Sequence, residues 1–121
     1  MSKHTVRFNV DLKINAGKLD AFQAIAQAMI VASQKEPGAL GYDWYLSDDR
    51  NRCRLIETYA DENAVQAHLN GPAVQDLVPK LLQTSSISRF EVYGYPGPKQ
   101  AETLTRFGAE IFPLWHALKA D

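Results

Sequence analysis

The chain lacks several features that would place it in a specialised class of protein. Its 121 residues include a single cysteine, Cys53, which excludes an internal disulfide and fits a reducing cytoplasm. The formal net charge is only -1, so nucleic acid is not expected as the main partner, because phosphate binding needs a basic surface. No apolar run is long enough to span a bilayer, and we expect no membrane segment.

Signals for export and for metal binding are also missing. The first residues, MSKHTVRF, contain no apolar signal core, which predicts a cytoplasmic protein. The three histidines, His4, His68 and His116, do not have the spacing of metal ligands. We therefore expect no metal site.

What is present indicates one ordinary globular domain. The composition is 45% hydrophobic and 22% charged, which is too apolar for a disordered chain. Alternation of apolar and polar residues predicts strands, and apolar residues three and four apart predict amphipathic helices. The expected strands span residues 5–14, 39–46, 52–59 and 87–95. The expected helices span about 18–35, 61–69, 74–82 and 99–119.

The order of these elements predicts an α+β fold of the ferredoxin-like, split βαβ type. Its four-stranded antiparallel sheet has helices on one face, and the bare face predicts a homodimer. Residues 1–95 form the domain, and Pro96-Gly97-Pro98 opens a C-terminal helical extension over residues 96–121. Pro113 should kink the helix of this extension, which could cover a cavity or contact the partner subunit.

Several short motifs follow one another in an order and spacing typical of one family. They are Glu36-Pro37-Gly38 with Gly41-Tyr42, Glu57-Thr58-Tyr59, Asp61-Glu62 with Ala64, and Ala67-His68-Leu69. Over about residues 5–93 the chain resembles the antibiotic biosynthesis monooxygenase (ABM) domain family. The resemblance implies a dimeric ferredoxin-like α/β barrel, in a family that includes cofactor-free quinol and polyketide monooxygenases. Two features depart from the pattern: Tyr59 stands where the family usually has Trp, and the extension lies outside the common domain.

His68 and Glu57 are the candidate catalytic residues. His68 lies on the apolar stripe of its helix, where it could act as a general base facing a cavity or as a structural hydrogen-bonding histidine. Glu57 shares a strand face with Tyr59 and could orient His68, bind a substrate hydroxyl or form an ion pair across the sheet. The two converge only if the helix covers that strand face.

Five further residues are candidates for substrate binding. Tyr59, Tyr42 and Trp44 could line a flat cavity, although core packing is the simpler role for Trp44. Asn9 could orient oxygen or a carbonyl, or simply face solvent. Arg89 could pair with an anionic phenolate or form a cross-strand ion pair.

The resemblance predicts a cofactor-independent monooxygenase that uses dioxygen to oxidise a small phenol, quinol or polyketide-like aromatic. One alternative is a haem-degrading monooxygenase, in which Asn9 would match the family Asn and the helical His would fall near Asp76. Another is a non-catalytic dimeric protein for small-ligand binding or stress response. An open cavity with His68 and Glu57 on its wall would favour catalysis, whereas a cavity filled by side chains would admit no substrate.

Overall fold

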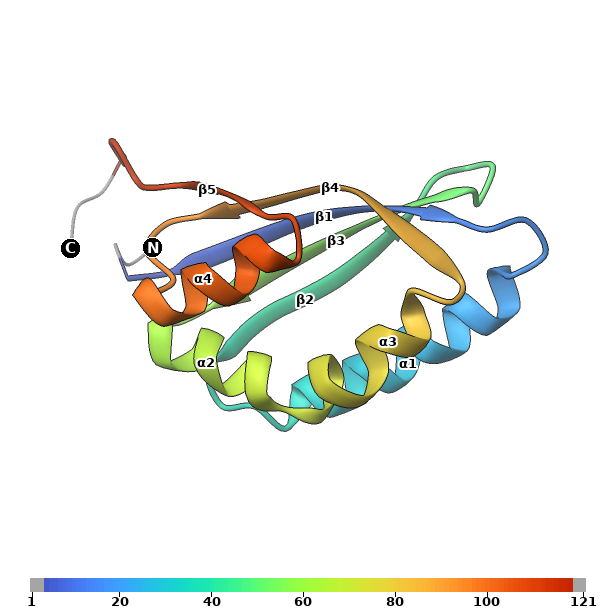
Figure 1. Cartoon of the computed structure of the whole chain (residues 1–121), viewed down its shortest axis with the longest axis horizontal. Helices are drawn as coiled ribbons and strands as arrows, with labels where there is room; N and C mark the ends of the chain where they lie inside the picture. Colours follow the sequence, from blue (N-terminus) through green and yellow to red (C-terminus); the bar gives the residue numbers. More distant parts are fainter. Residues whose placement is uncertain (1–3, 119–121) are drawn as a thin grey trace.

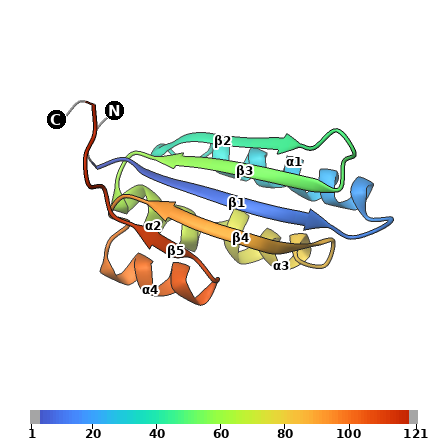
Figure 2. The same cartoon turned by 90° about the horizontal axis from the view of Figure 1, so that it is seen from above.

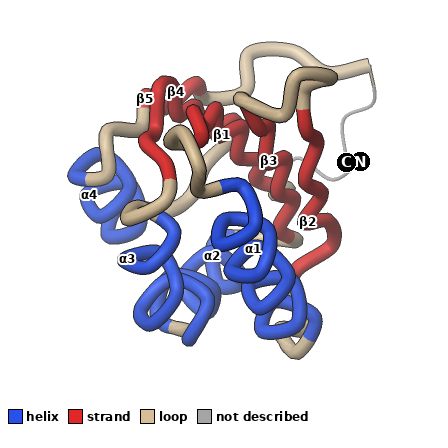
Figure 3. Tube along the Cα trace, turned by 90° about the vertical axis from the view of Figure 1, so that its right-hand side faces the viewer, coloured by secondary structure: helices blue, strands red, loops and turns tan. Residues whose placement is uncertain are grey.

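The computed structural model describes residues 4–118, which form a sheet with helices packed on one of its faces (Figures 1 and 3). The strands are β1 (Val6–Ile14), β2 (Ala39–Leu46), β3 (Arg52–Tyr59), β4 (Ser85–Tyr93) and β5 (Glu110–Phe112). The helices are α1 (Leu19–Gln34), α2 (Glu62–Asn70), the π-helical turn η1 (Ala73–Leu77), α3 (Val78–Leu81) and α4 (Pro98–Arg106).

The strand order is β2-β3-β1-β4-β5 (Figure 2). β1 lies between β3 and β4 and is antiparallel to both, and β2 is antiparallel to β3. The predicted α+β, ferredoxin-like fold is therefore confirmed. The sheet is mixed and five-stranded rather than purely antiparallel, because β5 adds to β4 in parallel.

The C-terminal extension differs from the long helix predicted for it. α4 ends at Arg106, and Gly108 follows with φ of 93°, a left-handed conformation that glycine adopts without strain. The chain then turns back to form β5, where the amide of Gly94 donates to the carbonyl of Phe112 at 2.9 Å. Pro113 follows this strand and kinks no helix. The apolar residues spaced by three and four thus belong to a helix, a strand and a coil.

Pro79, which falls within the predicted helix 74–82, also shapes the local structure. The segment divides into η1 and α3, and Pro79 occupies the first turn of α3. A proline is tolerated there because the amide it lacks would have no partner within the helix.

The alternating strands bury the face that the helices cover. In β3, Cys53, Leu55, Glu57 and Tyr59 are all buried, as are the matching apolar residues of β1. In β2 the predicted alternation is wrong at Leu40, which is 62% exposed. A register shift between Ala39 and Gly41 turns this side chain out of the core.

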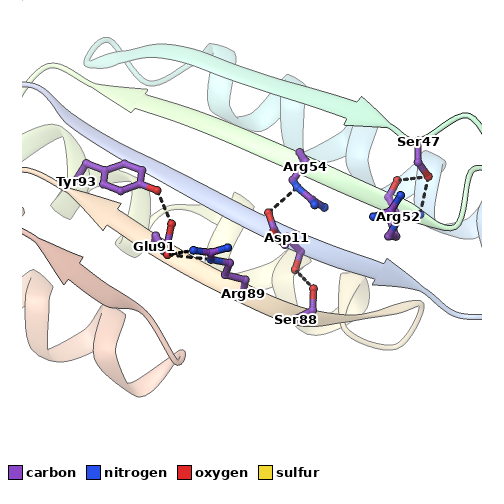
Figure 4. Close-up of polar contacts among 8 residues, drawn as sticks. All are labelled: Asp11, Ser47, Arg52, Arg54, Ser88, Arg89, Glu91 and Tyr93. Carbon is purple, nitrogen blue, oxygen red and sulfur yellow. Dashed lines mark hydrogen bonds and ion pairs between the residues drawn. The ribbon is translucent and has the colours of Figure 1, made fainter.

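The opposite face of the sheet carries several polar contacts (Figure 4). Arg54 Nε lies 2.9 Å from Asp11 Oδ1, which links β3 to β1. Along β4, Arg89 Nη2 lies 2.7 Å from Glu91 Oε2, and the Tyr93 hydroxyl donates to Glu91 at 2.5 Å. The homodimer predicted from this face stays a prediction.

Candidate functional site

α2 carries His68 into the interior. Its N-cap is Asp61, whose side chain accepts a hydrogen bond from the amide of Ala64 at 2.9 Å. The helix buries Ala64, Val65, His68 and Leu69 on one stripe, and His68 is only 3% exposed. The strand face that carries Glu57 is covered by helices, so the condition for bringing His68 and Glu57 together is met.

The imidazole of His68 lies between two carboxyl groups. Its Nδ1 is 2.9 Å from Glu36 Oε1 and 3.2 Å from Glu36 Oε2, whereas its Nε2 is 3.4 Å from Glu57 Oε1. A carboxylate oxygen only accepts hydrogen bonds, so the tautomer that fits this contact carries its proton on Nδ1, which donates a hydrogen bond to Glu36. Nε2 is then the nitrogen that can accept a proton, and its contact with Glu57 is longer than an ordinary hydrogen bond.

Glu36 is the site residue that the sequence prediction did not include. It lies just beyond α1, at the start of the Glu36-Pro37-Gly38 turn. A Cβ at Gly38 would lie 2.4 Å from the Cβ of Ala64, and one at Gly71 would lie 3.4 Å from Glu36 Oε2. Two glycines therefore allow this turn to approach α2 closely enough for Glu36 to reach His68. The Glu-Pro-Gly motif was the only sequence signal that could have identified it.

Glu57 and Tyr59 form a buried pair beside His68. The Tyr59 hydroxyl donates to Glu57 Oε1 at 2.5 Å, and Glu57 is 4% exposed. Burial raises the pKa of the Glu57 carboxyl above its usual value, because a charged carboxylate is poorly solvated there. Burial is also the largest cause that raises the pKa of Tyr59, so its phenol stays protonated. Tyr59 thus holds Glu57 from behind and does not line the cavity.

An open cavity lies between the sheet and the helices. It contains about 570 Å³ of empty space, part of which opens to solvent. Its polar lining residues among those described are Tyr42, Glu57 and His68. The remaining lining residues are apolar: Phe8, Val10, Leu12, Met29, Leu55, Leu69, Val74, Val78, Leu81, Leu82, Ile87, Phe90, Leu104 and Phe107. The arrangement is an apolar chamber with an acid–base cluster on one wall.

Tyr42 and Trp44 differ in their relation to this cavity. Tyr42 lines it, and burial raises the pKa of its phenol, which therefore stays neutral. Trp44 packs edge-on against Tyr42 and Phe22, with ring centroids 5.8 and 5.9 Å apart, and does not line the cavity. Its placement matches the packing role considered simpler for it.

Asn9 and Arg89 are not brought to the cavity. Both lie on strand positions that face away from the helices, and Asn9 is paired across the ladder with Ile56 and Glu91. Arg89 is bound to Glu91 on its own strand, and the side-chain hydrogen bond to Glu91 raises the pKa of its guanidinium further. The pocket residues that the structure brings together are therefore Glu57, His68 and Tyr42, with Tyr59 and Glu36 behind them.

Within residues 4–118, no helix is both long and apolar enough to cross a membrane. In the same part of the chain, no three histidine, cysteine, aspartate or glutamate side chains are grouped so that they could hold a metal ion.

Glu57→Gln should become progressively more stable than wild type as pH rises above 4.5, the ordinary pKa of a glutamate. The raised pKa of Glu57 means that the folded state binds this proton more tightly than the unfolded chain does. Its contribution is complete below the ordinary pKa of 4.5 and is lost as pH rises through the folded-state pKa. Each pH unit in that interval corresponds to about 1.4 kcal/mol, whereas glutamine keeps an acceptor and does not titrate.

Thermal unfolding of wild type and variant at several pH values measures this difference. The exposed Glu102→Gln serves as the control, because its carboxyl lies at the surface of α4. Parallel pH curves for Glu57→Gln and wild type would contradict the expectation.

Comparisons with known proteins agree with this architecture. The solved structure of MupZ from Pseudomonas fluorescens has a TM-score of 0.79 and 23% identity, and the match covers 96% of this chain and 94% of MupZ. SnoaB, a cofactor-independent oxygenase from Streptomyces nogalater, has a TM-score of 0.67 and 16% identity over 76% of this chain and 93% of SnoaB. Rv0793 from Mycobacterium tuberculosis has a TM-score of 0.64 and 23% identity, over 73% and 91% of the two chains.

The TM-scores show a shared fold, and identities this low show nothing beyond the fold. The match to MupZ extends over nearly the whole chain, whereas those to SnoaB and Rv0793 cover about three quarters of it. A search of curated proteins finds no match. The profile of the family described as antibiotic biosynthesis monooxygenase matches residues 5–80, which is more than half of the sequence. The chain therefore belongs to the antibiotic biosynthesis monooxygenase (ABM) family.

Proposed function

We propose that this protein is a cofactor-independent monooxygenase that oxidises a small phenol, quinol or polyketide-like aromatic with dioxygen. Membership of the ABM family supports this proposal, and SnoaB, which shares the fold, is a cofactor-independent oxygenase. The observation that carries it is His68, held by Glu36 at Nδ1 on the wall of an apolar cavity.

The first step is removal of the hydroxyl proton from the bound aromatic. His68 Nε2 is the acceptor, and Glu36 stabilises the imidazolium that forms. The resulting phenolate lies beside that imidazolium in a chamber with few polar groups. Attraction between the two charges is stronger there than in water, which favours the reactive anion.

The oxidation then balances without another reductant. The phenolate transfers one electron to dioxygen, and the phenoxyl radical and superoxide combine to form a peroxide at a ring carbon. Loss of water from the peroxide leaves a quinone. One oxygen atom of dioxygen enters the product, and the other leaves as water with two hydrogens of the substrate. The His68 imidazolium returns its proton to the peroxide, and Glu57, which burial favours in its protonated form, can supply the second proton to the departing oxygen. The proton released from the ring carbon then returns to Glu57.

A second candidate is acid–base catalysis without oxygen, such as isomerisation or hydration of a small electrophilic substrate. The specific observation in its favour is the distance of 3.4 Å between Glu57 Oε1, on a carboxyl whose pKa is raised by burial, and His68 Nε2 on the same wall. The haem alternative gains no support, because Asn9 faces away from the cavity and Asp76 is exposed.

Oxygen uptake with a panel of naphthols and hydroquinones tests the proposal. We expect uptake above that with heat-denatured protein, and one ¹⁸O atom in the quinone formed from a naphthol under ¹⁸O₂. A complete lack of enzyme-dependent oxygen uptake across the panel would overturn it. Substrate turnover without oxygen uptake would favour the acid–base alternative, and tight binding without turnover would favour the non-catalytic one.

A further inference from the structure

The cavity is polar at one end only. Tyr42, Glu57 and His68 are the lining side chains with polar groups, and all of them come from β2, β3 and α2. The lining residues from η1, α3, β4 and α4 are apolar, including Val74, Val78 and Ile87. A ligand that fills this space is therefore expected to have one polar end and an apolar body.

The polar end does not suit a negatively charged ligand. Among the described residues that line the cavity there is no lysine or arginine. Glu57 lies on the wall and Glu36 lies directly behind His68. A carboxylate or phosphate entering here would be desolvated next to two carboxyl groups, with no fixed cation to pair with it.

The C-terminal extension forms part of the wall and of the mouth. Leu104 is 1% exposed and lines the cavity, whereas Phe107 at 38% and Leu82 at 39% line it and also face solvent. These two side chains therefore mark where the cavity opens, between α3 and the end of α4.

The extension contacts α2, the helix that carries His68. Gln100 is buried, and its Nε2 donates to the carbonyl of Glu62 at the start of α2 at 3.0 Å. Behind it, β5 pairs with the edge strand β4 (Figures 1 and 2). These contacts join α4, which leads directly to Phe107, both to the helix that carries His68 and to the sheet.

We propose that the cavity selects an uncharged ring compound with a hydroxyl at the His68 end and an apolar substituent that extends toward Leu82 and Phe107. The C-terminal extension then determines which substituents are accepted. This inference rests on the proposed function only in taking the cavity as the substrate site. It adds the charge and shape of the substrate, neither of which follows from the family.

Two probe series test charge and length separately by isothermal titration calorimetry. The first compares methyl 4-hydroxybenzoate with 4-hydroxybenzoate, which differ in charge and by one methyl group that accounts for about fourfold by itself. We expect the acid to bind at least about tenfold more weakly, since its carboxylate stays unpaired. The second series runs from 4-methylphenol to 4-heptylphenol. We expect about fourfold tighter binding for each methylene that enters the apolar end.

Phe107→Ala locates the far end of the site. It should weaken binding of 4-heptylphenol by about fivefold and change binding of 4-methylphenol by less than about twofold, because only the long chain reaches the mouth. Phe112→Ala is the matched control, since Phe112 is 40% exposed in the same extension and does not line the cavity.

Three results would overturn the inference: equal affinity for the acid and its ester, affinity that does not change with chain length, or equal effects of Phe107→Ala and Phe112→Ala. Absence of binding by every phenol would also overturn it. Binding as described without oxygen uptake would refute the monooxygenase proposal alone. Oxygen uptake at a rate that does not depend on the alkyl chain length or the charge of the phenol would refute this inference alone.

Discussion

His68→Ala should lower the rate of oxygen uptake with a phenolic substrate by about 100- to 10,000-fold, the range typical for loss of a positioned general base. Nε2 of His68 is a proton acceptor on the cavity wall, and the ring is oriented by the contact of Nδ1 with Glu36 at 2.9 Å. Without it, the substrate must ionise in an apolar space with no cation to stabilise the phenolate.

The measurement is steady-state oxygen uptake by folded variant protein. His68 is buried, so thermal unfolding must first show that the variant is folded under assay conditions. Added imidazole supplies a second readout, because it can enter the space left by the side chain and restore part of the rate. His116→Ala is the control, since His116 is exposed and contacts Trp115. Full oxygen uptake by folded His68→Ala would remove His68 from the mechanism.

The convergence of His68 with Glu57 could be predicted because both depend on local periodicity. A strand places alternate residues on the same face, and a helix places residues three and four apart on one stripe. The apolar neighbours Leu55 and Val65 identify which face and which stripe are buried. Hydrophobic burial then forces the two elements together, and the polar side chains on those faces are brought along with them.

Glu36 could not be found by the same reasoning. It lies in a turn beyond the end of α1, where no periodicity applies, and its partner is 32 positions away in the sequence. Only the close approach of Gly38 to Ala64 brings this turn beside α2. Orienting His68 is one of the roles that the sequence predicts for Glu57, whereas the shorter contact of the imidazole is with Glu36.

In the C-terminal extension, by contrast, periodicity is present in the sequence but predicts the wrong structure. Its apolar residues have helical spacing, yet Leu104 belongs to α4, Ile111 to β5 and Leu118 to a coil. Spacing alone does not reveal that Gly108 ends the helix or that the open edge of β4 offers hydrogen bonds to a new strand. The edge is a tertiary feature, and it exists only once the first four strands have assembled.

The sequence does not reveal which face of the sheet carries Asn9 and Arg89, and this is why both were candidates for substrate binding. As residues of a single strand, their polar side chains are compatible with either a solvent-facing surface or a polar cavity. The ladder places Asn9 between Ile56 and Glu91, on the face opposite His68. A role for these two residues at the reacting atoms would require the substrate to lie on the wrong side of the sheet.

Glu36→Ala should reduce kcat by about 100-fold while leaving KM for a neutral phenol nearly unchanged. The Glu36 carboxyl does not line the cavity, so it should contribute little to binding. Its hydrogen bond at Nδ1 selects the tautomer in which Nε2 accepts the proton, and its charge stabilises the imidazolium formed in the rate-limiting complex. A loss confined to kcat is the signature of such a positioning residue.

The conservative variants separate orientation from mere packing. Glu36→Asp keeps the charge and shortens the side chain by one methylene, so it should recover part of the rate. Glu36→Gln keeps the length and removes the charge, and its amide nitrogen can donate to Nδ1 and stabilise the wrong tautomer. Its rate should therefore stay near that of Glu36→Ala. Asp20→Asn, at an exposed position of α1, is the control for loss of an acidic group. If Glu36→Gln retains the full kcat, the charge and acceptor at Nδ1 are dispensable, and His68 does not act as a base oriented by Glu36.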